Sequence, residues 1–170
     1  MRLPAIDVSL MNEHLSAHKG IINQLTNYHT KIKVPVLNQV IKDQIIVMSD
    51  HVRVMLLLLD PDRKKWVTLA TTNPKFEATQ FSNLDPHNSQ LKTLTSHLRT
   101  TSMHMAGDNY NSALRMKDEN VSHVHFQMAM QQASFQNIYS YIMKQMGWVY
   151  TPEATREVQL KMIKQYEDLI

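Results

Sequence analysis

Apolar residues recur at alternating steps of four and three along most of this 170-residue chain, and this spacing limits what it can fold into. Steps of four and three follow the 3.6-residue turn of an α-helix. The clearest stripe consists of Val121, His125, Met128, Gln132, Phe135, Tyr139, Ile142 and Met146. Similar stripes precede it, such as Met11, Leu15, His18, Ile22 and Leu25, and then Ile41, Ile45, Met48, Val52 and Met55. The sequence therefore predicts an all-α protein.

Turn and capping residues set the expected helix boundaries. The chain leaves helical geometry before Pro35, since a residue preceding proline is pushed out of the helical region. Asp118 is a plausible N-cap, and Gly147 suits a left-handed C-cap. Gly107 lies inside a helical pattern and permits a kink there. We expect helices over about residues 6–33, 36–59, 87–116 and 118–146, and a shorter one over 152–168 that Thr151 and Pro152 begin.

Residues 60–86 separate the second helix from the third and carry Pro61, Pro74 and Pro86. A long connection inside a compact domain is often a crossover that travels the length of the fold. Hairpin, crossover and hairpin give the up-down-down-up order of ferritin-like four-helix bundles. We therefore expect one domain over residues 1–170, with a long crossover between helices 2 and 3.

Glycine and cysteine are too scarce for several activities. The three glycines are isolated, which excludes GxGxxG, P-loop and GxSxG motifs, because each needs clustered glycines. The absence of cysteine excludes disulfides, thiolate nucleophiles and iron–sulfur clusters.

Charge and hydropathy give expectations about partners and location. The net charge is +3, but Lys and Arg are scattered, so nucleic-acid binding is not expected. The longest apolar run, Val54 to Leu59, is far shorter than the roughly 20 residues that span a bilayer, so membrane insertion is not expected. The N-terminus shows no signal peptide, which predicts cytoplasmic synthesis.

Nine histidines raise the question of a metal site. Ferritin-like di-iron sites use ExxH pairs, and no Asp or Glu in this chain has a His three residues later. A non-standard site for iron, manganese or zinc stays open, with weak candidates at His14, His18, His51, His97, His104, Asp108 and His125. His14 and His18 share a helix face, His97, His104 and Asp108 share another, and His18 could face His51.

The structural interpretation of these polar residues carries more weight than a metal site. Buried imidazoles and amides hydrogen-bond each other and fix helix register. The twelve methionines are likewise interpreted as flexible core packing, with a groove for a partner helix as the alternative. We therefore assign no catalytic, cofactor or metal residue, and expect no cofactor.

Short motifs in the second half resemble the coat F family of spore coat proteins. They are Tyr110-Asn111-Ser112-Ala113-Leu114-Arg115, then Tyr141-Ile142-Met143, then Gly147-Trp148-Val149-Tyr150-Thr151-Pro152. The resemblance covers about residues 90–155 and implies a ferritin-like bundle in the spore coat. It differs from the family pattern in one residue, Val149, between Trp148 and Tyr150. Trp148 is expected to fold over the last turn of its helix beside Tyr150 and Pro152.

Together these observations predict a non-enzymatic structural protein, a spore coat component that acts through protein–protein contacts. Other coat proteins are the expected partners, and a homo-oligomer is possible. The crossover and the fifth helix are the expected contact surfaces, because a four-helix core does not need them. The alternative is a ferritin-like metal-binding protein or metal-dependent oxidoreductase that uses the histidines.

Overall fold

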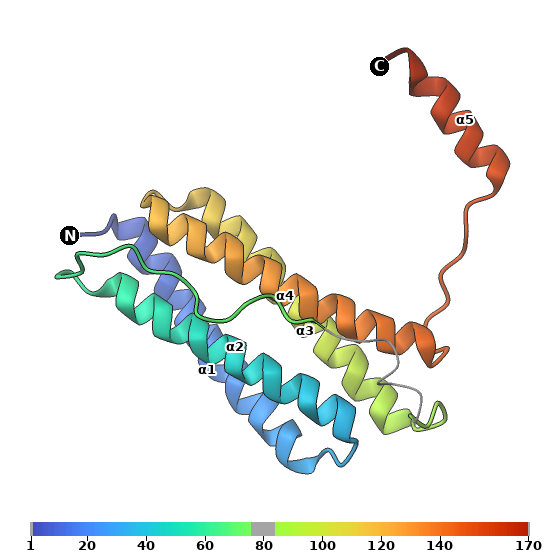
Figure 1. The fold of residues 1–170 in the computed structure, drawn as a ribbon, viewed down its shortest axis with the longest axis horizontal. Helices are drawn as coiled ribbons and strands as arrows, with labels where there is room; N and C mark the ends of the chain where they lie inside the picture. Colours follow the sequence, from blue (N-terminus) through green and yellow to red (C-terminus); the bar gives the residue numbers. More distant parts are fainter. Residues whose placement is uncertain (1, 76–83, 170) are drawn as a thin grey trace.

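The computed structural model describes residues 2–75 and 84–169, which form a bundle of four long helices and a separate short one (Figure 1). The long helices are α1 (Ala5–Lys31), α2 (Pro35–Leu59), α3 (Ser89–Arg115) and α4 (Glu119–Gln145). The short helix is α5 (Arg156–Tyr166), followed by a single 3₁₀ turn, Glu167–Leu169. No strand occurs among the described residues. The all-α prediction is confirmed.

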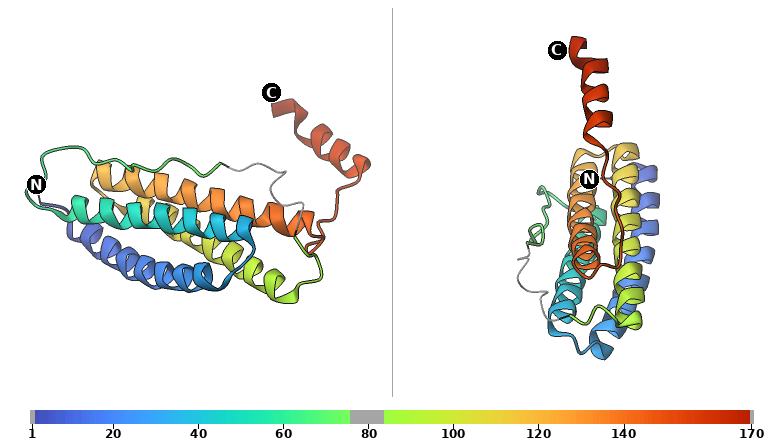
Figure 2. Two further views of the ribbon diagram at one scale, coloured as in Figure 1. Left: turned by 60° about the horizontal axis from the view of Figure 1, so that its bottom comes forward. Right: turned by 90° about the vertical axis from the view of Figure 1, so that its right-hand side faces the viewer.

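The two hairpins pack with the expected connectivity. α1 and α2 run antiparallel, as do α3 and α4, whereas α2 and α3 run in the same direction (Figures 1 and 2). A parallel pair needs a connection that returns along the bundle, and residues 60–75 run along its surface in this way. The predicted up-down-down-up order and crossover are therefore present.

Side-chain caps explain where the later helices begin and end. Asn88 and Asp118 accept hydrogen bonds from the backbone N–H groups of Leu91 and Val121. At the end of α4, Gly147 has φ of 66°, and the N–H of Trp148 donates to the carbonyl of Met143. This is the Schellman arrangement that glycine favours. The caps expected at Asp118 and Gly147 are confirmed.

Several expected boundaries were wrong by a few residues. α1 ends at Lys31 rather than residue 33, and α3 begins at Ser89 rather than 87. α5 covers 156–166 rather than 152–168, because Thr155, and not Thr151, accepts a hydrogen bond from the N–H of Val158 and so caps the helix. Gly107 introduces no break, since α3 is continuous from Ser89 to Arg115.

The bundle interior consists of two apolar clusters. One contains Leu25, Leu37, Ile41, Leu98, Phe135 and Tyr139. The other contains Leu10, Met11, Val54, Met55, Val121 and Met128. Along α2 and α4, polar residues separate the two: His51 lies between Met48 and Val54, and Gln131 and Gln132 lie between Met128 and Phe135. The core is therefore apolar at both ends and polar in between.

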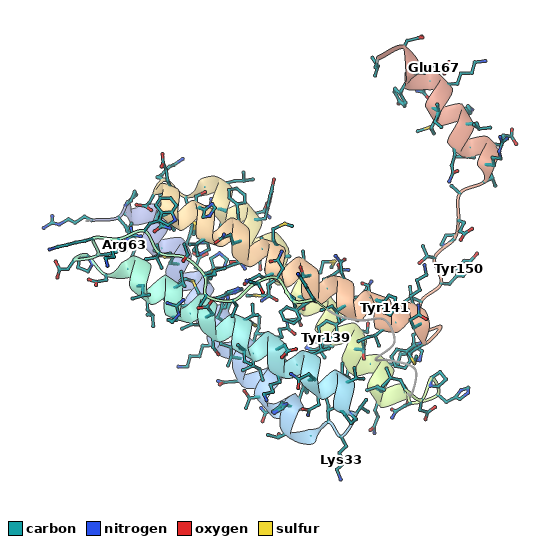
Figure 3. All side chains as sticks on the ribbon, in the orientation of Figure 1. Lys33, Arg63, Tyr139, Tyr141, Tyr150 and Glu167 are labelled. Carbon is teal, nitrogen blue, oxygen red and sulfur yellow. The ribbon has the colours of Figure 1, made fainter. Side chains whose placement is uncertain are left out.

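The expected seal at the end of α4 is only partly present. Trp148 is half-buried against the first apolar cluster, and its Nε1–H donates to the carbonyl of Pro86 at 2.7 Å. Tyr150 is 87% exposed on the segment leading to α5, so its predicted packing beside Trp148 was wrong (Figure 3). The methionines are also divided: Met128, Met143 and Met105 are buried, whereas Met103 and Met130 are exposed.

Candidate functional site

The polar residues between the two apolar clusters form the candidate site, which we call the polar layer. His14, His18, His51 and His125 gather there, all buried. The ring centroids of His18 and His51 are 5.3 Å apart, and those of His14 and His125 are 5.1 Å apart. The expectation that His18 faces His51 is confirmed.

The α3 candidates do not join this layer. His97, His104 and Asp108 are all exposed. His97 contacts Gln24 and Tyr28 at the bundle surface, with 3.1 Å between its Nε2 and the Nε2 of Gln24. The predicted shared face of α3 exists, but it is turned toward solvent and contributes no ligand to the interior.

The polar layer is joined by a chain of four hydrogen-bond contacts that crosses the bundle. His18 Nδ1 donates to the carbonyl of His14 at 2.7 Å, and His18 Nε2 lies 3.1 Å from His51 Nδ1. His51 Nε2 then lies 2.6 Å from Gln131 Oε1. Finally, Gln131 Nε2 donates to the carbonyl of Thr71 at 2.7 Å. Helices α1, α2 and α4 are thereby connected to the crossover.

Burial determines the ionisation of these histidines. It lowers the pKa of His18 to about 3 and that of His125 to about 4. It also lowers the pKa of His51 to about 4, although the Gln131 contact and the charge of Asp50 act in the opposite direction. The pKa of His14 is lowered by burial too, with Asp108 and Glu13 opposing the shift. A low-dielectric interior disfavours the charged imidazolium, which is the common cause.

A second polar network lies beside the first. The side-chain amide of Gln44 donates to Ser102 Oγ at 2.9 Å and to Gln132 Oε1 at 3.2 Å. Its carbonyl oxygen accepts from the hydroxyl of Tyr139, which points into the bundle (Figure 3). Burial raises the pKa of Tyr139, so the hydroxyl stays a donor. These hydrogen bonds join α2, α3 and α4 and fix their register relative to one another, as the structural interpretation predicts.

Polar side chains of the bundle also bind the crossover. One carboxylate oxygen of Asp50 accepts from the N–H groups of Ala70 and Thr71 and from the Thr71 hydroxyl, at 2.8 to 3.0 Å. Its other oxygen accepts from Arg53. These donors lower the pKa of the Asp50 carboxyl despite its burial. Asp50 is therefore an ionised anchor for residues 70 and 71.

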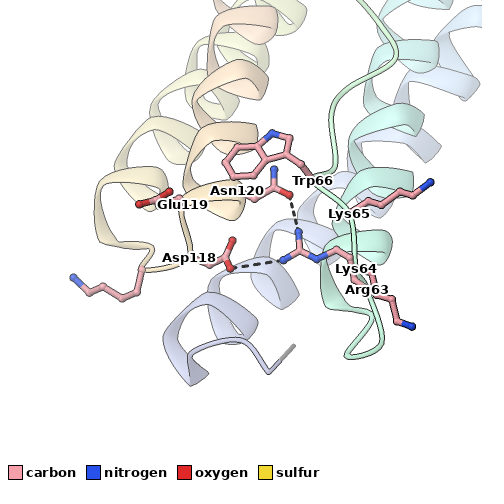
Figure 4. A pocket seen from close by; sticks show the side chains of 8 residues that line it. Arg63, Lys64, Lys65, Trp66, Asp118, Glu119 and Asn120 are labelled. Carbon is pink, nitrogen blue, oxygen red and sulfur yellow. Dashed lines mark hydrogen bonds and ion pairs between the residues drawn. The ribbon is translucent and has the colours of Figure 1, made fainter.

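Asn120 makes a second anchor near the start of the crossover. Its amide group donates to the carbonyl of Val67, and its oxygen accepts from the Val67 N–H, both at 2.8 Å. The same oxygen accepts from Arg63, which also lies 3.7 Å from Asp118 (Figure 4). A surface pocket of about 430 Å³ opens here, bordered by Lys64, Lys65, Trp66 and Lys117 among others. The guanidinium group of Arg63 is therefore already bound by Asn120 and Asp118.

Sequence reasoning did not single out Asp50, Asn120 or Gln131. The available signal was a polar residue close to a stripe position: Asn120 precedes Val121, Gln131 precedes Gln132, and Asp50 lies two residues from both Met48 and Val52. A helix buried on more than half of its circumference places such neighbours in a second groove. In this bundle the crossover fills that groove, and the three side chains satisfy its backbone.

The geometry does not favour a metal at the polar layer. The facing nitrogens of His18 and His51 contact each other, and Nδ1 of His125 donates to the carbonyl of Val121. Within residues 2–75 and 84–169, no group of three or more His, Asp or Glu side chains is arranged to hold a metal ion. The expectation of no cofactor stays a prediction, and so does its alternative, a site for iron, manganese or zinc.

Comparison with known proteins adds no relative. No family model, no curated protein and no solved structure matches the chain. In the part of the chain that the structure describes, no helix has the length and apolarity needed to cross a bilayer.

Proposed function

We propose that the protein is a non-enzymatic structural component that acts through protein–protein contacts, with α5 as its contact element. One observation carries this proposal: α5 has an apolar face that nothing in the described chain covers. Val158, Met162 and Tyr166 follow one another at steps of four, with Ile163 beside them, and their side chains are 51 to 61% exposed. An uncovered apolar helix face is typical of an interaction site.

The length of α5 supports the same conclusion. It has eleven residues, and every described residue from 149 to 169 is exposed. Isolated helices shorter than about 12 residues are marginal in water, because helix nucleation is costly. The Thr155 cap contributes on the order of 1 kcal/mol, which is small against that cost. A partner that covers the apolar face supplies the missing stabilisation.

The partner that the charges of α5 fit is a second copy of α5, running antiparallel. Arg156 lies at its N-terminal end, and Glu167 and Asp168 follow its C-terminal end. Antiparallel pairing places each end beside the opposite charge of the other copy and also opposes the helix dipoles. A closed pair of this kind is the usual symmetry of homodimers. Two helices this short bury a small area, so we expect weak association.

The place of this component is proposed to be the spore coat. The support is the resemblance of residues 90–155 to coat F proteins and the bundle connectivity that this resemblance implies. Weak self-association through a projecting helix suits a layered protein assembly, in which many such contacts act together. Contacts with other coat proteins would use the same apolar face.

Light scattering during size-exclusion chromatography tests the proposal. The intact chain is expected to shift from monomer toward dimer as its concentration rises from micromolar to millimolar. The double variant Met162→Glu, Ile163→Glu is expected to stay monomeric, because it places charges on the apolar face. The matched control Lys164→Glu changes the net charge by the same amount at an exposed residue on the opposite side of α5, and should associate like the unchanged chain.

Two results would contradict the proposal. One is a strictly monomeric intact chain at millimolar concentration. The other is undiminished association of the double variant, which would place the contact elsewhere. Circular dichroism adds an independent check, since the helical signal of α5 should grow with concentration only in chains that associate.

A further inference from the structure

The four contacts that join His14, His18, His51, Gln131 and Thr71 contain one hydrogen too few for neutral side chains. The first and last groups in this series of contacts are the backbone carbonyls of His14 and Thr71, which can only accept. Each of the four contacts therefore needs its own hydrogen. A neutral imidazole supplies one, so His18 and His51 supply two. The Gln131 amide supplies one more, because only its nitrogen side donates.

Turning the Gln131 amide over does not remove the deficit. The reversed amide would donate to His51 Nε2, but its oxygen would then face the carbonyl oxygen of Thr71. The Thr71 hydroxyl, 3.3 Å from the same Gln131 atom, already donates to Asp50 and does not relieve this repulsion. The other neutral tautomers also lose one contact. With His18 protonated at Nδ1 and His51 at Nε2, two lone pairs face each other between His18 Nε2 and His51 Nδ1. With both rings protonated at Nε2, the contact with the His14 carbonyl is lost. All four contacts form together only when the two imidazoles carry three hydrogens, and so one positive charge.

We propose that the His18–His51 pair is a proton-operated latch that holds the crossover on the bundle. With one added proton shared by the pair, the chain of contacts is complete and reaches Thr71. Without it, one contact is lost. This device is independent of the self-association proposed for α5.

The contact that opens is the one at the crossover. The bond from His18 to the carbonyl of His14 lies within one turn of α1, and the His18–His51 contact joins the packed hairpin of α1 and α2. Among the five residues joined by these contacts, Thr71 is the one that lies outside a helix. Its displacement disturbs the least packing, so loss of the proton weakens the attachment of residues 70 and 71.

The charges around the pair give the direction of the switch. On α1, His14 lies beside His18. The charges of Asp108 on α3 and of Glu13 favour the protonated form of His14. On α2, Asp50 is ionised, bound to Arg53, and favours the charged form of His51. On α4, His125 disfavours a charge on His18. Because burial lowers the pKa of both rings, the proton is taken up on the acidic side of their ordinary value of 6.5, and the latch is closed in acid.

Hydrogen exchange of the intact chain at about pH 3.5, just below the lowered pKa of His51 of about 4, and at about pH 8 tests the latch. The measured quantity is the protection of the Thr71 amide divided by that of the Met55 amide in the apolar core, since global stability affects both. We expect this ratio to fall about tenfold from the acidic to the basic sample, as loss of one hydrogen bond predicts. Nitrogen NMR of the rings of His18 and His51 should count three N–H groups in acid and two in base.

Two variants separate the latch from ordinary packing. Gln131→Met removes the link to Thr71, so the ratio should be low at both pH values. His97→Ala removes an exposed histidine that also contacts a glutamine, and should behave like the unchanged chain. A ratio that does not change with pH in the unchanged chain would overturn the proposal. So would two N–H groups on the pair in acid while the contact from Gln131 to Thr71 persists.

Discussion

The crossover and α5 both lie outside the four-helix core, and the structure treats them in opposite ways. Residues 67–71 of the crossover make backbone hydrogen bonds to buried side chains of α2 and α4. α5 has no buried residue and stands away from the bundle at the end of a linker (Figure 2). A segment belongs to the folded unit when the core supplies partners for its backbone, and Asp50, Asn120 and Gln131 do so only for the crossover.

This difference narrows the proposed contact surface. The sequence led us to expect both segments as interaction surfaces, yet the crossover uses much of its polar surface to bind the bundle. α5 leaves an entire apolar face unused. The contact role is therefore proposed for α5, whereas the described part of the crossover is interpreted as part of the core. The following experiments test that division.

Acidification should have the largest effect, and it should act on the bundle with its crossover. His18, His51 and His125 have folded-state pKa values of about 3 to 4, below 6.5 in the unfolded chain. The unfolded chain then binds more protons, so stability is full above pH 6.5 and falls as pH drops toward 4. Each such group contributes a slope of at most about 1.4 kcal/mol per pH unit. Urea unfolding across this range measures the slope.

Urea unfolding over the same pH range also compares the bundle with α5. A native state that holds the shared proton of the latch binds one proton itself, so the slope should be smaller by about one group over the range in which the pair is protonated. The double variant Met162→Glu, Ile163→Glu should show the unchanged slope, because α5 is outside the unit that unfolds. A flat stability profile between pH 6.5 and 4 would contradict the burial of neutral histidines.

Substitution of Asp50 should have the next largest effect. Asp50→Ala leaves the amides of Ala70 and Thr71 without their acceptor and removes the partner of Arg53. We expect a loss of about 1 to 3 kcal/mol in the free energy of unfolding, because several hydrogen bonds to the buried Asp50 carboxylate are lost, although Ala70 is exposed and Thr71 half-buried. Asp43→Ala on the same helix removes one contact with exposed Gln39 and should cost less than about 0.5 kcal/mol. Equal losses for the two variants would show that the crossover is not anchored as described.

Removal of α5 should have the smallest effect on stability. A chain ending at residue 150 keeps every buried residue of the bundle and Trp148. Its free energy of unfolding at low concentration should lie within about 0.5 kcal/mol of the intact chain, the range for surface changes. Thermal or urea unfolding followed by circular dichroism provides the comparison. A large loss would show that α5 packs on its own bundle and would remove the contrast with the crossover.

The local pattern of the sequence predicted most of the fold. Alternating steps of four and three identified the long helices and, on α4, the buried side, including His125 and Gln132. On α2 the stripe was less accurate, since Ile45 and Val52 are only half-buried whereas His51 and Val54 are buried. Asp118 and Gly147 identified ends correctly, because capping depends on backbone groups only a few residues away. Thr151 and Pro152 gave the wrong start for α5, because Thr155 offers an equivalent N-cap four residues later. No tertiary packing acts on this helix, so capping alone determines where it begins.

The candidate site was predicted less completely. The sequence put His18 on a stripe and offered His51 as its facing partner, and the two rings do face each other. It could not separate them from His97 and His104, since α3 presents those two to solvent. Nor could it show that Asp50, Asn120 and Gln131 hold the crossover, because each contact joins residues 20 or more positions apart.

By itself the sequence determined an all-helical chain, the approximate length of each helix and the polar residues within its stripes. These properties follow from periodicity and capping, which act within a few residues. Tertiary structure alone decided which polar residues meet, that the crossover completes the core and that α5 is left uncovered. Those outcomes depend on which buried donors and acceptors come within about 3 Å of each other, and this is settled only when the helices pack.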